Sequence, residues 1–422
     1  MKKLFALFLM ISCSAFTFAQ LSIESCYSKA RANYPLIKQY DLIEKSKDYN
    51  LSNAGKGYLP QITFSAKATY QSDVTQLPID LSQLGIQGLN IPALSKDQYG
   101  TSLNINQIIW DGGAIQSKKE EIQASSEAER RNLEVELYSI NNRVNQVFFG
   151  ILLFDAQISQ IQLFREELQR SYDKIASWME NGVANQVDMD AIKVEQLKAI
   201  QNESQLTHTR NAYLNILSAL IGEELSPQTT LLKPKAISMI NNSIQRPELD
   251  LFNARIKNLE AQNKEIDAGL MPRLGIFVTG GYGKPGLNML ENEFSTYYIA
   301  GVNLSWNFSN LYSNKNSKRK IDTGIASIQT QQETFLFNTR LDISSKQSEI
   351  NKYRDQLKYD DEIISLRNSI KQSSEVKMAN GILSGIDLMR DINAEEQAKQ
   401  DKIFHEIEML LAMYSLKFTT NN

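Results

Sequence analysis

The sequence predicts a mainly α-helical fold with a membrane β-barrel portion, in which each chain contributes tandem-duplicated long helical hairpins and four strands. Three observations lead to this prediction. A nine-residue turn signal at 181–189 returns 199 positions later, at 380–388. Apolar residues follow a heptad spacing along the segment before each copy. Four further segments alternate apolar and polar side chains over the length of a membrane-crossing strand.

Residues 1–19 have the features of a secretory signal peptide, because Lys2-Lys3 precede an apolar run at 4–11, and the segment ends in the small residue Ala19. The alternative is a lipoprotein acylated at Cys13, although Met10 fits that recognition sequence poorly. After Ala19 no apolar run approaches the roughly 20 residues of a membrane-spanning helix. We therefore expect no transmembrane helix.

Composition excludes several classes of function. A formal net charge of −3 gives no reason to expect nucleic acid as a partner. Cleavage of the signal peptide leaves one cysteine, Cys26, so no intramolecular disulfide is expected. Two histidines in the whole chain are too few for a rich metal site. No catalytic group of residues stands out, so we expect neither cofactor nor enzymatic activity.

The duplication divides the mature chain into a first repeat at 20–222, a connector at 223–245 and a second repeat at 246–422. The connector is rich in Ser, Asn, Thr and Pro. In the first repeat, 21–57 is predicted to be helical and to stop before Leu59-Pro60, since the residue before proline is pushed out of the helical region. In the second repeat, Pro247 opens the equivalent helix, which ends at Met271-Pro272.

Strands are predicted next in each repeat, at 61–71 and around 102–106, and then at 274–279 and 298–308. The polar residues Asn104 and Asn303 alternate with apolar neighbours, which gives each strand one apolar and one polar face. Two half-buried hairpins of a soluble sheet would show the same alternation. In a membrane, the lipid-facing residues are Leu103, Ile105, Val302, Leu304 and Trp306.

Long helices follow the strands. Asp111 is a candidate N-cap for a helix that begins near Ala114, and 71 positions separate Trp110 from Asn181 and likewise Ser309 from Asn380. At 1.5 Å per residue such a helix is about 100 Å long. Each ends in a turn where Asn-Gly stops one helix and an aspartate caps the next: Asn181, Gly182 and Asp188, then Asn380, Gly381 and Asp387.

The strand number predicts the assembly. Four strands leave two unpaired edges, which lipid does not tolerate, so the sheet has to close with other copies of the chain. Two chains would give eight strands, a barrel that side chains fill. Three chains would give twelve strands and a lumen, with the long helices forming a hollow α-helical barrel below.

These motifs resemble those of the outer membrane efflux proteins, the TolC family. The run 103–113, Leu-Asn-Ile-Asn-Gln-Ile-Ile-Trp-Asp-Gly-Gly, resembles the family's strand-to-helix motif, and 181–188 and 380–387 resemble its two periplasmic tips. Arg246-Pro247-Glu248-Leu249 and Leu59-Pro60 match further landmarks. The resemblance implies a homotrimer with a twelve-stranded barrel in the outer membrane of a Gram-negative bacterium and a helical tunnel in the periplasm.

The resemblance also implies a passive exit duct for a tripartite efflux or type I secretion system. Its partners would be outer membrane lipid, a periplasmic adaptor (membrane fusion protein) and an inner-membrane pump of the RND or ABC type. A periplasm-spanning coiled-coil tether or a trimeric surface adhesin is the alternative function. The sequence identifies neither the exported substrate nor the class of pump.

The gate at the tips is expected to differ from the one known in the family. Members with a charged, hydrogen-bonded gate carry a tyrosine, an arginine and two aspartates near the second tip. The corresponding residues here are Met378, Leu383, Asp387 and Arg390, so one of the four is kept. The hypothesis is a mainly apolar gate in which Arg390 offsets part of the charge of Asp387.

Overall fold

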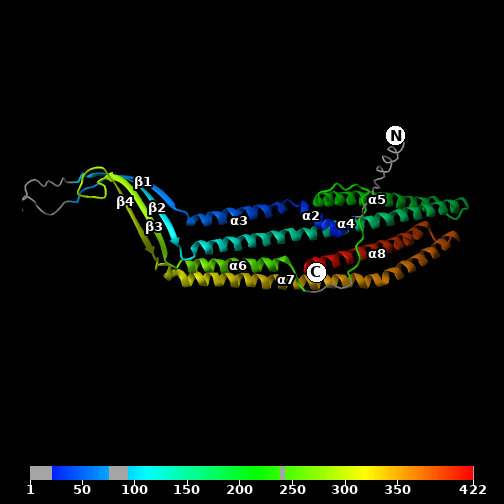
Figure 1. The fold of residues 1–422 in the computed structure, drawn as a ribbon. Helices are drawn as coiled ribbons and strands as arrows, with labels where there is room; N and C mark the ends of the chain where they lie inside the picture. The colour runs from blue at the N-terminus through cyan, green and yellow to red at the C-terminus, as the bar shows by residue number, and fades with distance from the viewer. Residues whose placement is uncertain (1–20, 76–93, 238–242, 422) are drawn as a thin grey trace, which may run out of the picture. The chain divides into compact units, whose positions relative to one another are not determined.

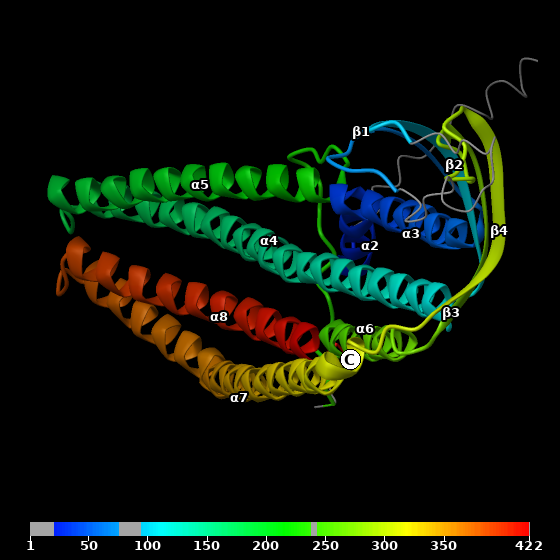
Figure 2. The same ribbon diagram turned by 90° about the vertical axis from the view of Figure 1, so that its left-hand side faces the viewer.

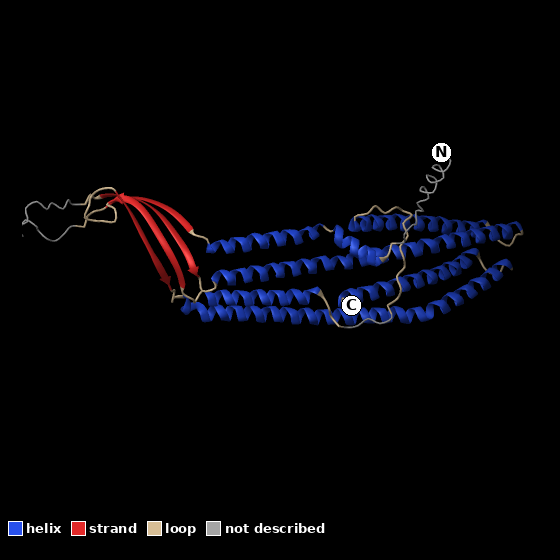
Figure 3. Cartoon of the chain, in the orientation of Figure 1, coloured by secondary structure: helices blue, strands red, loops and turns tan. Residues whose placement is uncertain are grey.

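The computed structural model describes residues 21–75, 94–237 and 243–421, so the expected signal peptide at 1–19 and Cys13 lie outside the described residues. The described part of the chain is mostly helical, with four antiparallel strands in one sheet (Figure 1, Figure 3). This confirms the predicted fold class. The chain divides into two compact units. One contains the described parts of 1–39, 132–249 and 332–422, and the other contains those of 40–131 and 250–331.

We call the first the helical unit. It contains α2 (Ile23–Asn33), a short 3-10 helix (Pro35–Lys38), α5 (Gln186–Ile221), α8 (Gly385–Thr420) and the C-terminal parts of α4 (Ala114–Glu180) and α7 (Asn310–Ala379). Within this unit the hairpin of α4 and α5 packs against the hairpin of α7 and α8 (Figure 2), with α5 in contact with α8 and ion pairs between α4 and α7. The predicted heptad seam of α4 forms its core, with these residues buried: Leu133, Leu137, Ile140, Val144, Val147, Ile151, Ile161, Leu168 and Ile175.

The second is the strand unit. It holds β1 (Gln61–Tyr70), β2 (Asp97–Trp110), β3 (Arg273–Lys284) and β4 (Ser295–Ser305), paired in the order β1-β2-β3-β4. It also holds α3 (Gln39–Gly55) and α6 (Pro247–Ala268). Each unit combines segments of both sequence repeats. The repeat boundaries therefore stay a prediction.

Three elements differ from the prediction. The expected helix at 21–57 is interrupted, because Tyr34 before Pro35 has an extended backbone with ψ 128°. β3 continues beyond the predicted end at 279 to Lys284, so the glycines at 280–283 belong to the strand. β4 ends at Ser305, and Trp306 follows it with its indole N–H donating to the Leu270 carbonyl at 2.9 Å.

The start of α4 matches the prediction. The Asp111 carboxylate accepts hydrogen bonds from the backbone N–H groups of Gly113 (3.0 Å) and Ile115 (2.6 Å). Gly112 has φ 71°, and a Cβ there would lie 2.3 Å from the Cβ of Met271. The turn between β2 and α4 therefore requires glycine at this position.

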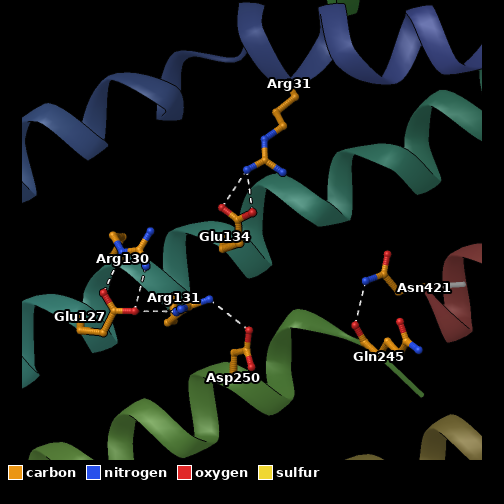
Figure 4. A network of polar contacts seen from close by, with 8 residues as sticks. All are labelled: Arg31, Glu127, Arg130, Arg131, Glu134, Gln245, Asp250 and Asn421. Carbon is orange, nitrogen blue, oxygen red and sulfur yellow. Dashed lines mark hydrogen bonds and ion pairs between the residues drawn. The ribbon is translucent and has the colours of Figure 1, made fainter. Parts of the chain in front are cut away.

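Ion pairs anchor α4 to its neighbours inside each unit (Figure 4). In the helical unit, Arg31 of α2 donates to both carboxylate oxygens of Glu134 at 2.7 Å. In the strand unit, Arg131 pairs with Asp250 of α6 at 3.0 Å and also with Glu127. The hydrogen bond from Arg130, with that from Arg131, lowers the pKa of Glu127 to about 2. Glu127 is therefore charged at any physiological pH.

Candidate functional site at the helical tips

The two tips have the same turn and lie at the same end of the helical unit (Figure 1, Figure 2). Gly182 and Gly381 have positive φ, 74° and 70°. In each tip the glycine N–H and the next N–H donate back into the helix, a Schellman ending that satisfies its last carbonyls. These bonds are Gly182 to Met179 (3.0 Å), Val183 to Trp178 (2.8 Å), Gly381 to Met378 (2.9 Å) and Ile382 to Lys377 (2.9 Å). The Asn181 and Asn380 side chains cap two further carbonyls at 2.8 Å.

The predicted N-caps are wrong by three residues. Asn185 caps α5, accepting from the backbone N–H groups of Val187 and Asp188, and Ser384 caps α8, accepting from that of Asp387. Both aspartates are therefore N3 residues. The signal was present in the sequence, because Asn or Ser followed three residues later by an acidic residue is the pattern of a capping box.

Asp188 joins the two tips. Its side chain is buried, and one carboxylate oxygen accepts from its own cap residue, the N–H of Asn185, at 3.0 Å. The other oxygen accepts from the backbone N–H of Gly385, the first residue of α8, at 2.7 Å. A Cβ on Gly385 would lie 2.6 Å from the Asp188 Cβ and 3.0 Å from its Cα. The contact therefore requires glycine at 385.

Asp387 occupies the equivalent position in the second tip but faces solvent. Its carboxylate accepts from the Ser384 hydroxyl at 2.7 Å and lies 3.4 Å from an Arg390 guanidinium nitrogen. The expected charge offset by Arg390 is thus present within one chain. Because both side chains are exposed, this pair contributes little to stability.

Beneath the tips, an apolar cluster packs the two hairpins together. Met378 is 1% exposed inside it, and Leu383 is half-buried against it. Met378 therefore contacts the core of its own chain. The gate role of Met378, Leu383 and the other tip residues remains a prediction. The buried members are Ile161, Phe164, Leu168, Ile175, Met189, Ile192, Ala199, Met378, Leu388, Met389 and Ile392.

A buried charge cluster crosses the same interface farther from the tips. Lys371, which interrupts the apolar ladder of α7, forms ion pairs with Glu167 of α4 and with Glu395 of α8, the latter at 2.5 Å. Lys399 lies 2.8 Å from Glu395. Burial alone would lower the pKa of Lys371, but its hydrogen bonds to the two carboxylates outweigh burial and raise that pKa. Lys371 is thus charged and joins both hairpins.

The strand register places four of the five predicted lipid-facing residues on one face. Ile105 pairs with Ile62 and Val278, and Leu103 pairs with Phe64. Val302 pairs with Ile276, and Leu304 with Leu274. The polar residues Asn104 and Asn303 occupy the opposite face. Trp306 lies beyond β4, so its predicted place on the strand is corrected.

Exposed aromatic side chains gather at both ends of the sheet. Tyr58, Trp110, Trp306 and Phe308 lie near the helix end, and Tyr70, Tyr99, Tyr282 and Phe294 lie near the other. Phe294 stacks on Tyr99 and Tyr282. Two aromatic bands that flank an apolar face are typical of strands that cross a membrane.

In the residues that the structure describes, no group of three or more His, Cys, Asp or Glu side chains could hold a metal ion. One helix, α4, is long and apolar enough in part to cross a membrane by length and composition. Its seam residues, however, form the core of the helical unit.

An apolar strand face with aromatic bands and paired helical hairpins are the features that the sequence predicts for a channel-type outer membrane protein. Residues 26–223 match the model of the family described as outer membrane efflux protein. The match covers a little under half of the chain and bears out the resemblance to this family that the motifs predicted, together with the expected location in the outer membrane and extension into the periplasm. Members of this family are channels and not enzymes.

Solved structures share the fold at low sequence identity. The CusC channel is 13% identical, with a TM-score of 0.68 over 94% of this chain and 91% of CusC. VceC from Vibrio cholerae is 10% identical, with a TM-score of 0.66 over 94% of both chains. The Neisseria gonorrhoeae MtrE channel, solved in its open state, is 11% identical, with a TM-score of 0.65 over 95% of this chain and 89% of MtrE. A search of curated proteins found no match.

Proposed function

We propose that three copies of this chain form a passive exit duct of a tripartite efflux or type I secretion system. The observation that carries the proposal is the open sheet. β1 and β4 each pair on one side only among the described strands, and the sheet has an apolar face. In lipid the unpaired backbone groups of these edges are costly, so closure with further copies is favoured. Three copies give twelve strands and a water-filled lumen.

Exposed apolar side chains on α5 and α7 of the helical unit support a ring. α5 exposes Val194 and Leu197, and α7 exposes Ile363, Leu366 and Ile370. α5 belongs to the first hairpin and α7 to the second, so the two apolar stripes lie on different hairpins of the unit (Figure 2). A contact between α5 of one copy and α7 of the next would cover both stripes. Such head-to-tail contacts close into a ring.

The tips are the proposed docking point for a periplasmic adaptor, which would link the duct to an inner-membrane pump of the RND or ABC type. Val183 and Val187 on the first tip, and Ile382 and Ile386 on the second, are exposed apolar residues at the end of the unit. Apolar residues grouped in this way fit a protein partner better than water. The same end would hold the gate, with Asp387 and Arg390 beside the entrance.

The proposal is tested with purified protein in mild detergent and in planar lipid bilayers. Native mass spectrometry should give a trimer, and the trimer should conduct ions. The alternative, a periplasmic tether or adhesin, predicts a stable assembly without conductance. A stable monomer in native membranes would contradict the closure argument directly.

A further inference from the structure

The polar face of the sheet has a simple chemistry. Partners in a register row point to the same side of the sheet. In four of the rows on this face, every residue except Lys67 is uncharged. We call the end of the sheet farther from the helices its outer end and the other its inner end. From the outer to the inner end, the four rows are Lys67-Gly100-Gly283-Ser295, Ser65-Ser102-Gly281-Tyr297, Thr63-Asn104-Thr279-Ile299 and Gln61-Asn106-Phe277-Gly301. Hydroxyl and amide groups dominate, and Thr279 donates to the Asn104 side chain at 2.7 Å.

Charge is distributed unevenly between the two faces. The described strands carry four charged residues. Asp97 and Lys284 share the apolar face, since they pair with Tyr70 and Tyr99 near the outer end. The polar face holds the other two, Lys67 and Arg273, and both are positive. No carboxylate lies on this face within β1–β4.

The surroundings of Lys67 leave it open to solvent. Its row continues into Gly100 and Gly283, which have no side chains to cover it, and Lys67 itself is exposed. A Cβ on Gly100 would be 3.5 Å from Lys67 Cε, so the lysine stem lies over this glycine. Within β1–β4 no carboxylate lies on the same face as this ammonium group.

We propose that the strand lumen of this channel is a cationic passage that favours anionic solutes, with Lys67 as the residue that sets this preference. The inference rests on the proposed function, because it requires the polar face to line a closed barrel. Threefold symmetry would then place three lysines at one level near the outer end and three copies of Arg273 near the inner end. Like charges along a narrow lumen concentrate counter-ions there.

The test measures the local potential with thiol reagents and does not require the tips to open. Ser65→Cys places a reporter on the polar face two residues from Lys67, about 7 Å away. The reporter is treated from the outer side with anionic sulfonatoethyl or cationic trimethylammonioethyl methanethiosulfonate. The native Cys26 is fully buried and serves as an unreactive background. The measured quantity is the ratio of the two reaction rates.

Lys67→Gln should lower the ratio of anionic to cationic rate about threefold at 0.15 M salt, and by more at low salt where screening is weaker. Lys284→Gln removes the same charge from the opposite face and should leave the ratio unchanged. An unchanged ratio in Lys67→Gln, or a reporter that does not react in the trimer, would overturn the inference.

Native mass spectra and conductance are recorded on the same preparations. These measurements distinguish a failure of the proposed function from a failure of the cationic lumen. A trimer that conducts but shows no effect of Lys67 contradicts the cationic lumen alone. A monomer, or a trimer without conductance, contradicts the proposed function and with it this inference.

Discussion

The two tips are nearly identical in local structure and differ in what their equivalent residues contact. Both end in a Schellman turn and begin the next helix with a capped first turn. Asp188 is nevertheless buried against Gly385, whereas Asp387 faces solvent beside Arg390. Met378 is 1% exposed, whereas its counterpart 199 positions earlier, Met179, is 37% exposed. The repeated motif therefore determines the local backbone conformation, and packing against the neighbouring helices determines the contacts and burial of each side chain.

The difference also shows how the hairpins are joined. The first tip supplies a carboxylate and the second supplies a backbone N–H, so the link is asymmetric although the sequence is duplicated. Asp188 is held by its contact with α8. Asp387 has no such contact with the first hairpin among the described residues, which leaves its charge available near the proposed entrance.

The largest expected effect is a difference in unfolding free energy between substitutions of the two methionines. Met378→Ala should lower the free energy of unfolding by about 2–5 kcal/mol, because it opens a cavity in the cluster between the hairpins. Met179→Ala should change it by less than about 0.5 kcal/mol, as expected for an exposed position. Chemical unfolding followed by circular dichroism gives both values. Equal losses would show that the tips are packed alike.

The next effect concerns Gly385. Gly385→Ala should cost about 1–3 kcal/mol, because the new Cβ meets the Asp188 side chain and backbone and forces the tips apart. The matched control is Gln186→Ala, the equivalent position in the first tip, where the side chain is exposed. Here the comparison is the melting temperature of the two variants. A Gly385→Ala protein as stable as the control would contradict the close approach of the tips.

A smaller, pH-dependent effect distinguishes buried Glu396 from its exposed counterpart Leu197. Burial raises the pKa of Glu396, although Gln400 and Gln160 donate hydrogen bonds to it. A carboxyl whose pKa is raised by folding favours the folded state below its ordinary pKa of about 4.3, and that contribution is lost as the pH rises through the folded value. Glu396→Gln should therefore stabilise the protein at pH 7, on the order of 1 kcal/mol, and not at pH 4.

The check for Glu396→Gln is the difference in unfolding free energy from wild type across this pH range. A gain that is equal at pH 4 and pH 7 would show that the carboxyl is not buried in a way that disfavours its charge. The interface between the helices around Glu396 would then be more hydrated than the structure shows.

Much of the fold was predictable because its signals are local. The heptad spacing identified the core side of α4, and period-two alternation placed Leu103 and Ile105 on one face. The break at Pro35 was missed, although the proline rule that stopped the helix at Leu59 applies there too. Trp306 was assigned to β4 because alternation alone does not show where pairing ends.

The site was less predictable because its contacts join distant segments. Asp188 and Gly385 are 197 positions apart, and neither residue type indicates the other as its partner. Lys371 lies between Glu167 and Glu395 only because three helices meet there, and no local pattern in the sequence indicates these partners. Met179 and Met378 have equivalent sequence positions, so no local pattern distinguishes the exposed one from the buried one.

The most direct test of the central claim compares Asp188→Asn with Asp387→Asn in both stability and ion selectivity. Asp188→Asn should lower the free energy of unfolding by about 1–3 kcal/mol, because a buried carboxylate that accepts two backbone hydrogen bonds is lost, and should leave the cation-to-anion permeability ratio unchanged. Asp387→Asn should lower that permeability ratio in planar bilayers and leave stability within about 0.5 kcal/mol of wild type. Equal effects of the two substitutions on both measurements, or the reverse assignment, would contradict the account.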